Sequence, residues 1–253
     1  MNLGLKGLRA IITGGTKGIG RSILEHLIAE DCHVAFCARS AYEIKKANDA
    51  LTNPRVKAIG QVLDVGDAAA LKKWVGESAL AMGGIDIVIA NVSALAVDPG
   101  EKSWHSAFNV DMLGTVRLVD AAMPHLERSK AASIVTISSV SAREIDFAAG
   151  PYGAMKAALV HYTQGLAQQL AARKIRANTV SPGNTYFPGG VWENIEHGNP
   201  ELFRKSLAMN PGGRMARPEE IARSVVFLAS PASSFTSGTN LVVDGALTRG
   251  VQL

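Results

Sequence analysis

Short apolar runs alternate with longer amphipathic stretches along this chain of 253 residues. The runs are rich in β-branched residues and apolar throughout, which is typical of strands buried on both faces of a parallel sheet. Seven strands are predicted, at Leu8–Thr13, His33–Ala38, Val56–Val62, Ile85–Ala90, Ser133–Ser138, Ile175–Val180 and Asn240–Val243. Between them the apolar residues recur at helical spacing, which predicts helices at Ile19–Glu30, Ala41–Leu51, Ala68–Met82, Phe108–Leu126 and Tyr152–Arg173.

Regular alternation of strand and helix predicts right-handed crossovers between parallel strands. We therefore expect an α/β fold of Rossmann type, a doubly wound parallel sheet of about seven strands with helices on both faces. No linker divides the chain, so residues 1–253 are expected to form a single domain. The long irregular stretch Ser181–Pro218 indicates an insertion at about residues 184–217. Its large apolar side chains either form a lid over a substrate or fasten the loop to the core: Tyr186, Phe187, Trp192, Phe203 and Met209.

Composition and charge narrow the class of protein. Hydrophobic residues make up 47% of the chain and charged residues 19%, which is typical of a folded globular protein. The net charge of +4 is scattered and forms no basic stripe with interleaved aromatic residues, so nucleic-acid binding is not expected. Cys32 and Cys37 lack metal-site spacing and fit buried thiols in a reducing compartment. With no apolar run near the roughly 20 residues of a membrane span, we expect a cytoplasmic protein without metal or membrane attachment.

A glycine-rich segment, Thr13–Gly20, follows the first predicted strand and opens a helix. Glycines such as Gly14, Gly18 and Gly20 allow a tight turn whose backbone N–H groups can approach a pyrophosphate. The helix that follows adds the positive end of its dipole. The sequence therefore favours a dinucleotide site, and an ordinary strand-to-helix turn is the alternative.

The end of the second predicted strand bears on the choice of cofactor. It carries no acidic residue that could bond a ribose 2′-hydroxyl, and Arg39 follows Gly20 by 19 residues, close to the expected offset of about 20. A guanidinium at this place can clasp a 2′-phosphate, and Lys17 can add a second positive charge. We predict a preference for NADP(H) over NAD(H). The alternative is that Arg39 is a solvated surface charge.

Tyr152 and Lys156 lie four residues apart in a predicted helix and therefore share one face. A nearby ammonium favours the phenolate form of a tyrosine, which makes this weak acid more useful in proton transfer. Ser138 and Ser139 follow a central strand, at the sheet edge where ligands bind in open α/β folds. The hydroxyl of Ser139 is expected to hold a carbonyl oxygen, whereas Ser138 is expected to pack or bond the backbone.

These residues together resemble the short-chain dehydrogenase/reductase family, and the resemblance extends along nearly the full chain. The family's cofactor motif T-G-x-x-x-G-x-G matches Thr13–Gly20, and its aspartate after the third strand matches Asp64. Only Asn91 is present from its Asn-Asn-Ala-Gly segment after the fourth strand. Its Pro-Gly after the sixth strand matches Pro182-Gly183.

The resemblance implies a set of residues around the cofactor. Phe187 stands where the family often has a threonine, and Thr185 is the alternative contact. The cofactor-binding residues expected from these motifs and from the resemblance together are Gly14, Thr16, Lys17, Gly18, Ile19, Gly20, Arg39, Ser40, Asp64, Val65, Asn91, Tyr152, Lys156, Pro182, Gly183 and Thr185.

The resemblance also implies hydride transfer between a nicotinamide and a carbonyl or alcohol carbon. In reduction, Tyr152 would donate the proton while Ser139 holds the carbonyl oxygen. Lys156 would favour ionisation of the phenol and bond the nicotinamide ribose. The family's helix asparagine falls on Asn109, which would place a water for proton relay.

The substrate and the partners are less closely defined by the sequence. The apolar insertion favours a substrate with hydrophobic bulk, either a 3-oxoacyl thioester or a cyclic or hydrophobic ketone. An acyl-carrier-protein substrate would need a basic patch, for which the candidates are Arg128, Lys130, Arg204 and Lys205. A non-catalytic dinucleotide sensor is the alternative function. The resemblance further implies a homo-oligomer, a tetramer or dimer formed through the helices Phe108–Leu126 and Tyr152–Arg173.

Overall fold

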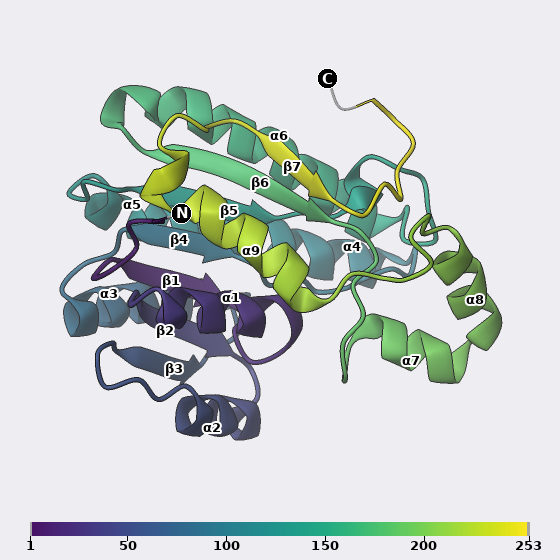
Figure 1. The fold of residues 1–253 in the computed structure, drawn as a ribbon, viewed down its shortest axis with the longest axis horizontal. Helices are drawn as coiled ribbons and strands as arrows, with labels where there is room; N and C mark the ends of the chain where they lie inside the picture. Colours follow the sequence, from purple (N-terminus) through teal and green to yellow (C-terminus); the bar gives the residue numbers. More distant parts are fainter. Residues whose placement is uncertain (1, 252–253) are drawn as a thin grey trace.

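A computed structural model describes residues 2–251, and the two ends of the expected domain, residues 1 and 252–253, lie outside the described residues. Seven strands form one parallel sheet in the order β3-β2-β1-β4-β5-β6-β7 (Figure 1). The strands are β1 (Arg9–Thr13), β2 (His33–Ala38), β3 (Ala58–Val62), β4 (Ile87–Ala90), β5 (Ser133–Ile137), β6 (Arg176–Pro182) and β7 (Asn240–Val243). The predicted doubly wound fold is confirmed.

Helices cover both faces of the sheet because alternate strand residues point to opposite sides. In β1, Ile12 packs into the core cluster beneath α1 (Gly18–Ala29), α2 (Ala41–Ala50) and α9 (Pro218–Ala229). The neighbouring Ile11 packs into the cluster beneath α3 (Ala68–Met82), α5 (Gly114–Leu126) and α6 (Pro151–Leu170). Short 3₁₀ turns complete the framework at Val140–Ala142, Ala171–Arg173 and Pro231–Ser233.

The helix predicted at Phe108–Leu126 is part of a longer run that is not α-helical throughout. It begins with α4 (Glu101–Ala107), passes through a π-helical segment, Phe108–Leu113, and continues as α5. Segments of this kind are rare and are frequent at functional sites. The π-helical segment therefore marks a candidate functional region beside the ends of β4 and β5.

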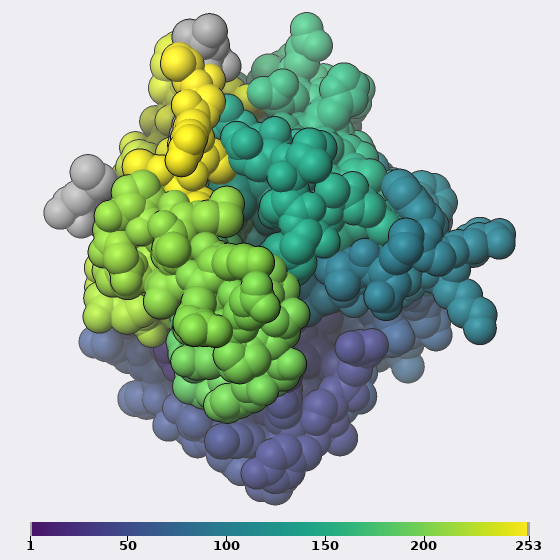
Figure 2. Space-filling model, turned by 90° about the vertical axis from the view of Figure 1, so that its right-hand side faces the viewer, coloured from purple at the N-terminus to yellow at the C-terminus, as the bar shows by residue number. Residues whose placement is uncertain are grey.

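The stretch Ser181–Pro218 was expected to be irregular. It instead contains two helices, α7 (Val191–Gly198) and α8 (Pro200–Ala208). Asn199 starts α8 by accepting a hydrogen bond from the backbone N–H of Leu202 at 3.1 Å, and Pro200 occupies the first helical position. These short helices form the green lobe that stands beside the residue 140–150 region in Figure 2. No helix among residues 2–251 is long and apolar enough to cross a membrane.

Candidate active site

The glycine loop after β1 presents backbone donors at the carboxyl edge of the sheet. Gly14 and Gly18 adopt φ values of +75° and +54°, a left-handed region that side chains rarely enter. The next helix, α1, has no side-chain cap from Lys17 and no acidic residue in its first turn. Its first N–H groups therefore lie open to an anion, and they fit the pyrophosphate of a dinucleotide.

Asn91 braces this loop from the end of β4. Its side-chain Nδ2 donates to the carbonyl oxygens of Thr13 and Gly14 at 3.1 and 3.0 Å. A Cβ added to Gly20 would collide with the Gly14 carbonyl, so the loop and the first turn of α1 pack backbone to backbone. Ile19 packs against the core cluster beneath. The structure thus gives Asn91 and Ile19 contacts that shape the loop.

At the end of β2, the structure adds a residue that the sequence analysis missed. Arg39 and Ser40 are exposed, and Ser40 caps α2 by accepting from the backbone N–H of Glu43 at 3.2 Å. The Glu43 carboxylate in turn accepts from the Thr16 hydroxyl at 3.0 Å and lies 3.5 Å from Lys17 Nζ. The sequence contained a signal for Glu43, because a glutamate three residues after a serine cap places its carboxylate at the start of a helix.

The turn after β3 carries the next two predicted cofactor residues. Asp64 accepts a hydrogen bond from the backbone N–H of Gly66 at 2.9 Å, which closes the turn. Val65 is buried and lies against Gly114 at the start of α5. Both therefore lie at the carboxyl edge next to the end of β2.

The end of β6 carries Pro182 and Gly183. A Cβ on Gly183 would lie 2.7 Å from the Cβ of Asp244, so this position is too tight for a side chain. Thr185 is buried, donates to the Gly183 carbonyl at 3.0 Å and bridges to Ala216. Its hydroxyl is thus engaged in shaping the backbone.

Phe187 brings the insertion onto the glycine loop. A Cβ added to Gly18 would overlap the Phe187 ring, and one added to Gly190 would lie 3.0 Å from it. The ring therefore lies directly against Gly18, and both glycines leave room for it.

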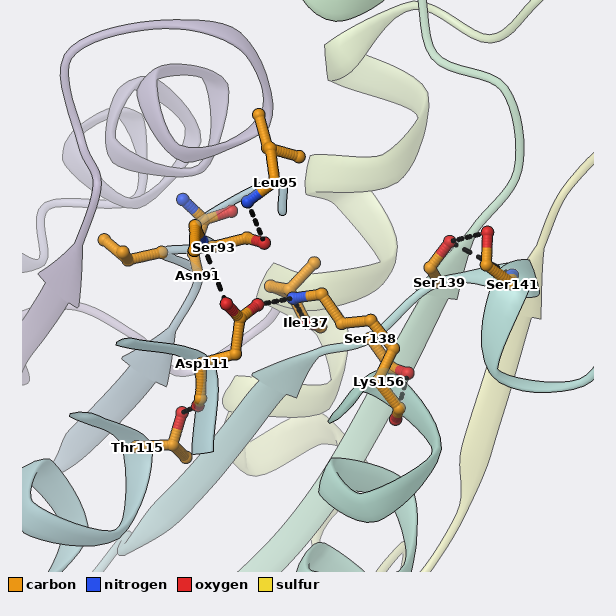
Figure 3. A network of polar contacts seen from close by, with 12 residues as sticks. Asn91, Ser93, Leu95, Asp111, Thr115, Ile137, Ser138, Ser139, Ser141 and Lys156 are labelled. Carbon is orange, nitrogen blue, oxygen red and sulfur yellow. Dashed lines mark hydrogen bonds and ion pairs between the residues drawn. The ribbon is translucent and has the colours of Figure 1, made fainter. Parts of the chain in front are cut away.

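Tyr152 and Lys156 begin α6 beside the end of β5. Lys156 Nζ lies 5.6 Å from the centroid of the Tyr152 ring. The ammonium is buried, donates to the Ile137 carbonyl at 3.1 Å and lies 3.2 Å from Oδ1 of Asp111 (Figure 3). Ser138 donates to the Lys156 carbonyl at 2.8 Å, so it bonds backbone as expected.

Ser139 lies on the segment that packs against the start of α6. Its hydroxyl accepts from the Ser141 N–H and donates to the Ser141 hydroxyl, both at 3.2 Å. Ser141 Oγ donates to Asp146 at 2.6 Å. A Cβ added to Gly153 would lie 2.9 Å from the Ser141 carbonyl, so the residue after Tyr152 approaches this segment closely. Ser139 and Tyr152 therefore lie on two segments that are in contact with each other.

Asn109 does not join this group. Its Nδ2 donates to the Gly66 carbonyl at 3.3 Å, and its Oδ1 accepts from Arg117 at 3.0 Å. The residue that meets Lys156 is Asp111, which is buried. Helical residues two apart point in different directions, so only one of the two can face the lysine. The structure thus brings Asp111, rather than Asn109, to Lys156, and the role of Asn109 in placing a water stays a prediction. The sequence signal for Asp111 was a single acidic residue within an apolar helical stretch.

The four candidate basic residues do not form one patch. Arg128 and Lys130 lie between α5 and β5, where the chain enters the amino ends of the strands. Arg204 and Lys205 lie on α8, which belongs to the insertion after the carboxyl end of β6. Because the two pairs lie at opposite ends of a parallel sheet, they cannot together form the basic patch that an acyl-carrier protein would need.

An open pocket of about 410 Å³ is formed within the insertion itself. Tyr186, Phe203, Leu207 and Met215 contribute to its wall, and the Tyr186 hydroxyl donates to Glu196 at 2.6 Å. Ser139, Tyr152 and Lys156 do not line it, so it is separate from the reaction site. Among residues 2–251, no three His, Cys, Asp or Glu side chains gather as a metal site.

Comparisons with known proteins agree with this geometry. The family model described as enoyl-(acyl carrier protein) reductase matches residues 14–248. Isoepoxydon dehydrogenase of Penicillium expansum is 38% identical over 257 residues, covering 100% of this chain and 99% of that protein. Dehydrogenase/reductase SDR family member 4 of Oryctolagus cuniculus is 31% identical and covers 93% of this chain and 92% of its own length.

The fold also matches solved structures closely. An NADPH-bound short-chain oxidoreductase of Pseudomonas aeruginosa, described as containing an atypical catalytic center, superposes with a TM-score of 0.89. It is 28% identical, and the match covers 98% of this chain and 99% of that one. The glycine loop, the tyrosine–lysine pair and these matches agree: the chain belongs to the short-chain dehydrogenase/reductase family, whose members are NAD(P)-dependent oxidoreductases that interconvert carbonyl and alcohol groups.

Proposed function

We propose that this enzyme uses NADP(H) to interconvert a hydrophobic, cyclic or similarly bulky ketone and its secondary alcohol, with Tyr152 as the proton donor in reduction. The observation that carries the proposal is the buried Lys156 ammonium under the Tyr152 ring, at the sheet edge that also holds the glycine loop. A cation here favours the phenolate produced by proton transfer.

Each residue has one task in the proposed reaction. The bound nicotinamide supplies or accepts the hydride. In reduction, the Tyr152 hydroxyl gives its proton to the carbonyl oxygen as the carbon gains the hydride, and in oxidation it takes that proton back. Ser139 donates a hydrogen bond to the same oxygen and steadies its developing charge. Lys156 stabilises the phenolate and bonds the ribose of the cofactor.

The preference for NADP(H) is supported by the charges around the end of β2. Arg39 is exposed there, and Lys17 extends from the adjoining glycine loop. Two cations suit a 2′-phosphate. Thr16 and Ser40 supply neighbouring hydroxyls, and the related Pseudomonas aeruginosa structure holds NADPH.

A hydrophobic ketone is favoured over an acyl-carrier thioester by the surface near the site. Four large apolar residues on the loops after β4 and β5 are exposed: Leu95, Val97, Ile145 and Phe147. Because both loops follow the carboxyl ends of strands, they border the place where a substrate would enter. The candidate basic residues do not converge on this mouth, so nothing comparable supports a carrier-protein partner.

We also propose that residues 184–217 act as a lid on a single domain of residues 1–253. The segment touches both sides of the site. Phe187 lies on Gly18 of the glycine loop, and Trp192 meets Phe147 of the loop after β5 edge to face, with ring centroids 5.5 Å apart. A segment attached to both sides can close over a substrate between them.

Replacing Tyr152 with phenylalanine tests the proposal. Tyr152→Phe is expected to lower kcat for reduction of a panel of cyclic ketones by about 100-fold or more, because the proton donor is lost. NADPH binding, measured by fluorescence titration, should change by no more than about twofold. The matched control is Tyr162→Phe on the same helix, which should keep its activity because the Tyr162 ring packs against the core cluster beneath α3, α5 and α6.

Two results would contradict the assignment. Near-normal kcat in Tyr152→Phe would remove Tyr152 as the donor. NADPH binding by the wild-type protein with no turnover of any ketone or alcohol would favour the alternative, a dinucleotide sensor.

A further inference from the structure

Asp111 forms a buried ion pair with Lys156. The two side chains are only 2% and 3% exposed, and Oδ1 of Asp111 lies 3.2 Å from Nζ (Figure 3). Burying two charges costs desolvation free energy, and apolar side chains of similar volume often stabilise a fold equally well. Packing alone therefore does not account for a carboxylate at this position.

The two oxygens of Asp111 face two different donors. Oδ2 accepts from the backbone N–H of Ala94, on the loop after β4, at 2.8 Å. Oδ1 faces Lys156 and accepts no hydrogen bond from the other described residues. The Thr115 hydroxyl donates to the Asp111 carbonyl at 2.7 Å and anchors the backbone of the π-helical segment. An asparagine would replace one of these oxygens with an NH2 group, which would face either the Ala94 N–H or the Lys156 ammonium donor to donor.

The ion pair affects the charge that reaches Tyr152. The ammonium of Lys156 lies next to the tyrosine ring, and a carboxylate close to that ammonium offsets part of its field. Other charged groups lie on the neighbouring elements. Arg117 on α5 turns to Asn109 and Gly66, Asp146 accepts from Ser141, and Arg143 and Glu144 lie on the loop after β5. Among these contacts, Asp111 is the carboxylate paired with Lys156.

We propose that Asp111 is a positioning residue that holds Lys156 in place and sets the net charge that the Tyr152 phenol experiences. By offsetting the ammonium, it moves ionisation of the phenol to higher pH than an unpaired lysine would give. The proposal rests on the proposed function in so far as Tyr152 is the proton-transfer group. It also makes a claim about the protein without cofactor, which can be tested separately.

Titration of the Tyr152 phenol tests the claim directly. The ultraviolet absorbance of the wild-type protein and of Tyr152→Phe is measured as a function of pH, without cofactor. The difference between the two curves gives the ionisation midpoint of Tyr152. Asp111→Asn is expected to lower the midpoint by about one pH unit, the order expected for one charge at about 10 Å and an effective dielectric constant of about 20. The pH profile of kcat should shift in the same direction. Asp111→Glu, which keeps the charge, should return the midpoint toward the wild-type value, and Asp49→Asn, an exposed charge change on α2, should not move it.

A second pair of variants avoids leaving Lys156 buried without its partner. Lys156→Gln keeps Asp111 alone, and Lys156→Gln/Asp111→Asn removes both charges. The midpoint should be lower in the double variant than in Lys156→Gln.

Unchanged midpoints in both comparisons would overturn the proposal, even if Tyr152→Phe abolishes turnover. Shifted midpoints in a protein that reduces no ketone would support the role of Asp111 and overturn only the proposed function.

Discussion

Glu43 places a negative charge beside the site expected to bind the phosphates of the cofactor. Its carboxylate contacts Thr16 and Lys17, two residues expected to surround the phosphates of the cofactor. The Lys17–Glu43 pair is partly exposed, and pairs of this kind contribute only about 0–1 kcal/mol. A 2′-phosphate can therefore displace Glu43 from Lys17, but the carboxylate also opposes the added negative charge.

Substitution of Arg39 and Glu43 should change NADPH affinity in opposite directions. Arg39→Ala is expected to raise the Kd for NADPH by about 10- to 100-fold, because charged hydrogen bonds to the 2′-phosphate are lost. Glu43→Gln should lower it by up to about fivefold. The Kd for NADH should change by less than about twofold in both. Fluorescence titration measures these values, with Arg55→Ala, an exposed arginine paired with Asp31, as the control.

Equal losses for NADPH and NADH in Arg39→Ala would show that Arg39 does not read the 2′-phosphate. The cofactor preference would then need another source.

At the scale of elements, Asp86 joins three segments at the amino edge of the sheet. It accepts from the Arg9 side chain at 2.7 and 2.8 Å and from the Arg9 backbone N–H at 2.9 Å. Ser129, in the turn after α5, donates to the same carboxylate at 2.6 Å. Asp86 itself lies just before β4 and is buried. This contact therefore ties β1 to β4 and to the turn that leads into β5.

The pKa of Asp86 predicts an acid-sensitive contribution to stability. Burial acts to raise this pKa, but hydrogen bonds from Arg9 and Ser129 outweigh it and hold the pKa below its usual value. Because the folded pKa is lower than the unfolded one, the stabilisation is fully present above about pH 4 and disappears as pH falls through the folded value. Asp86→Asn is expected to lower the free energy of unfolding at pH 7 by about 2–3 kcal/mol.

Urea denaturation at pH 7 and pH 3 measures this contribution. The difference between wild type and Asp86→Asn should shrink at the lower pH, whereas the exposed Asp98→Asn should stay within about 0.5 kcal/mol at pH 7. A difference that does not depend on pH would contradict the electrostatic explanation.

At the scale of the whole molecule, the two cysteines lie in the two core clusters on opposite faces of the sheet. Cys32 belongs to the cluster under α1 and α9, and Cys37 to the cluster under α3, α5 and α6. Both are free and fully buried, as the sequence predicted.

The homo-oligomeric state and the cytoplasmic location of the protein stay predictions.

Burial raises the pKa of both thiols to about 12, so at pH 8 they are almost entirely protonated. The native protein should therefore react with an alkylating reagent far more slowly than the unfolded protein, by about 1,000-fold or more. Mass spectrometry of alkylated protein with and without denaturant measures this. Ser234→Cys, at an exposed position, supplies a reactive control. Rapid labelling of native wild-type protein would show that one face of the core opens readily.

The sequence by itself determined the features that depend on local periodicity and spacing. Apolar runs defined the seven strands, the glycine loop predicted a phosphate site, and the spacing of Tyr152 and Lys156 placed both on one helical face. The tertiary structure decided which distant residues meet at that site. A π-helical segment turns Asp111 toward Lys156 and leaves Asn109 beside Gly66 and Arg117.

The helices of the insertion carry local signals that the sequence analysis did not use, such as the Asn199 cap and Pro200 at the start of α8. The contacts of Glu43 with Thr16 and Lys17 and the separation of the basic residues were decided by the tertiary structure. The physical reason is that the period of a helix or strand depends on neighbours along the chain. Contacts between side chains far apart in sequence depend on how the completed elements pack.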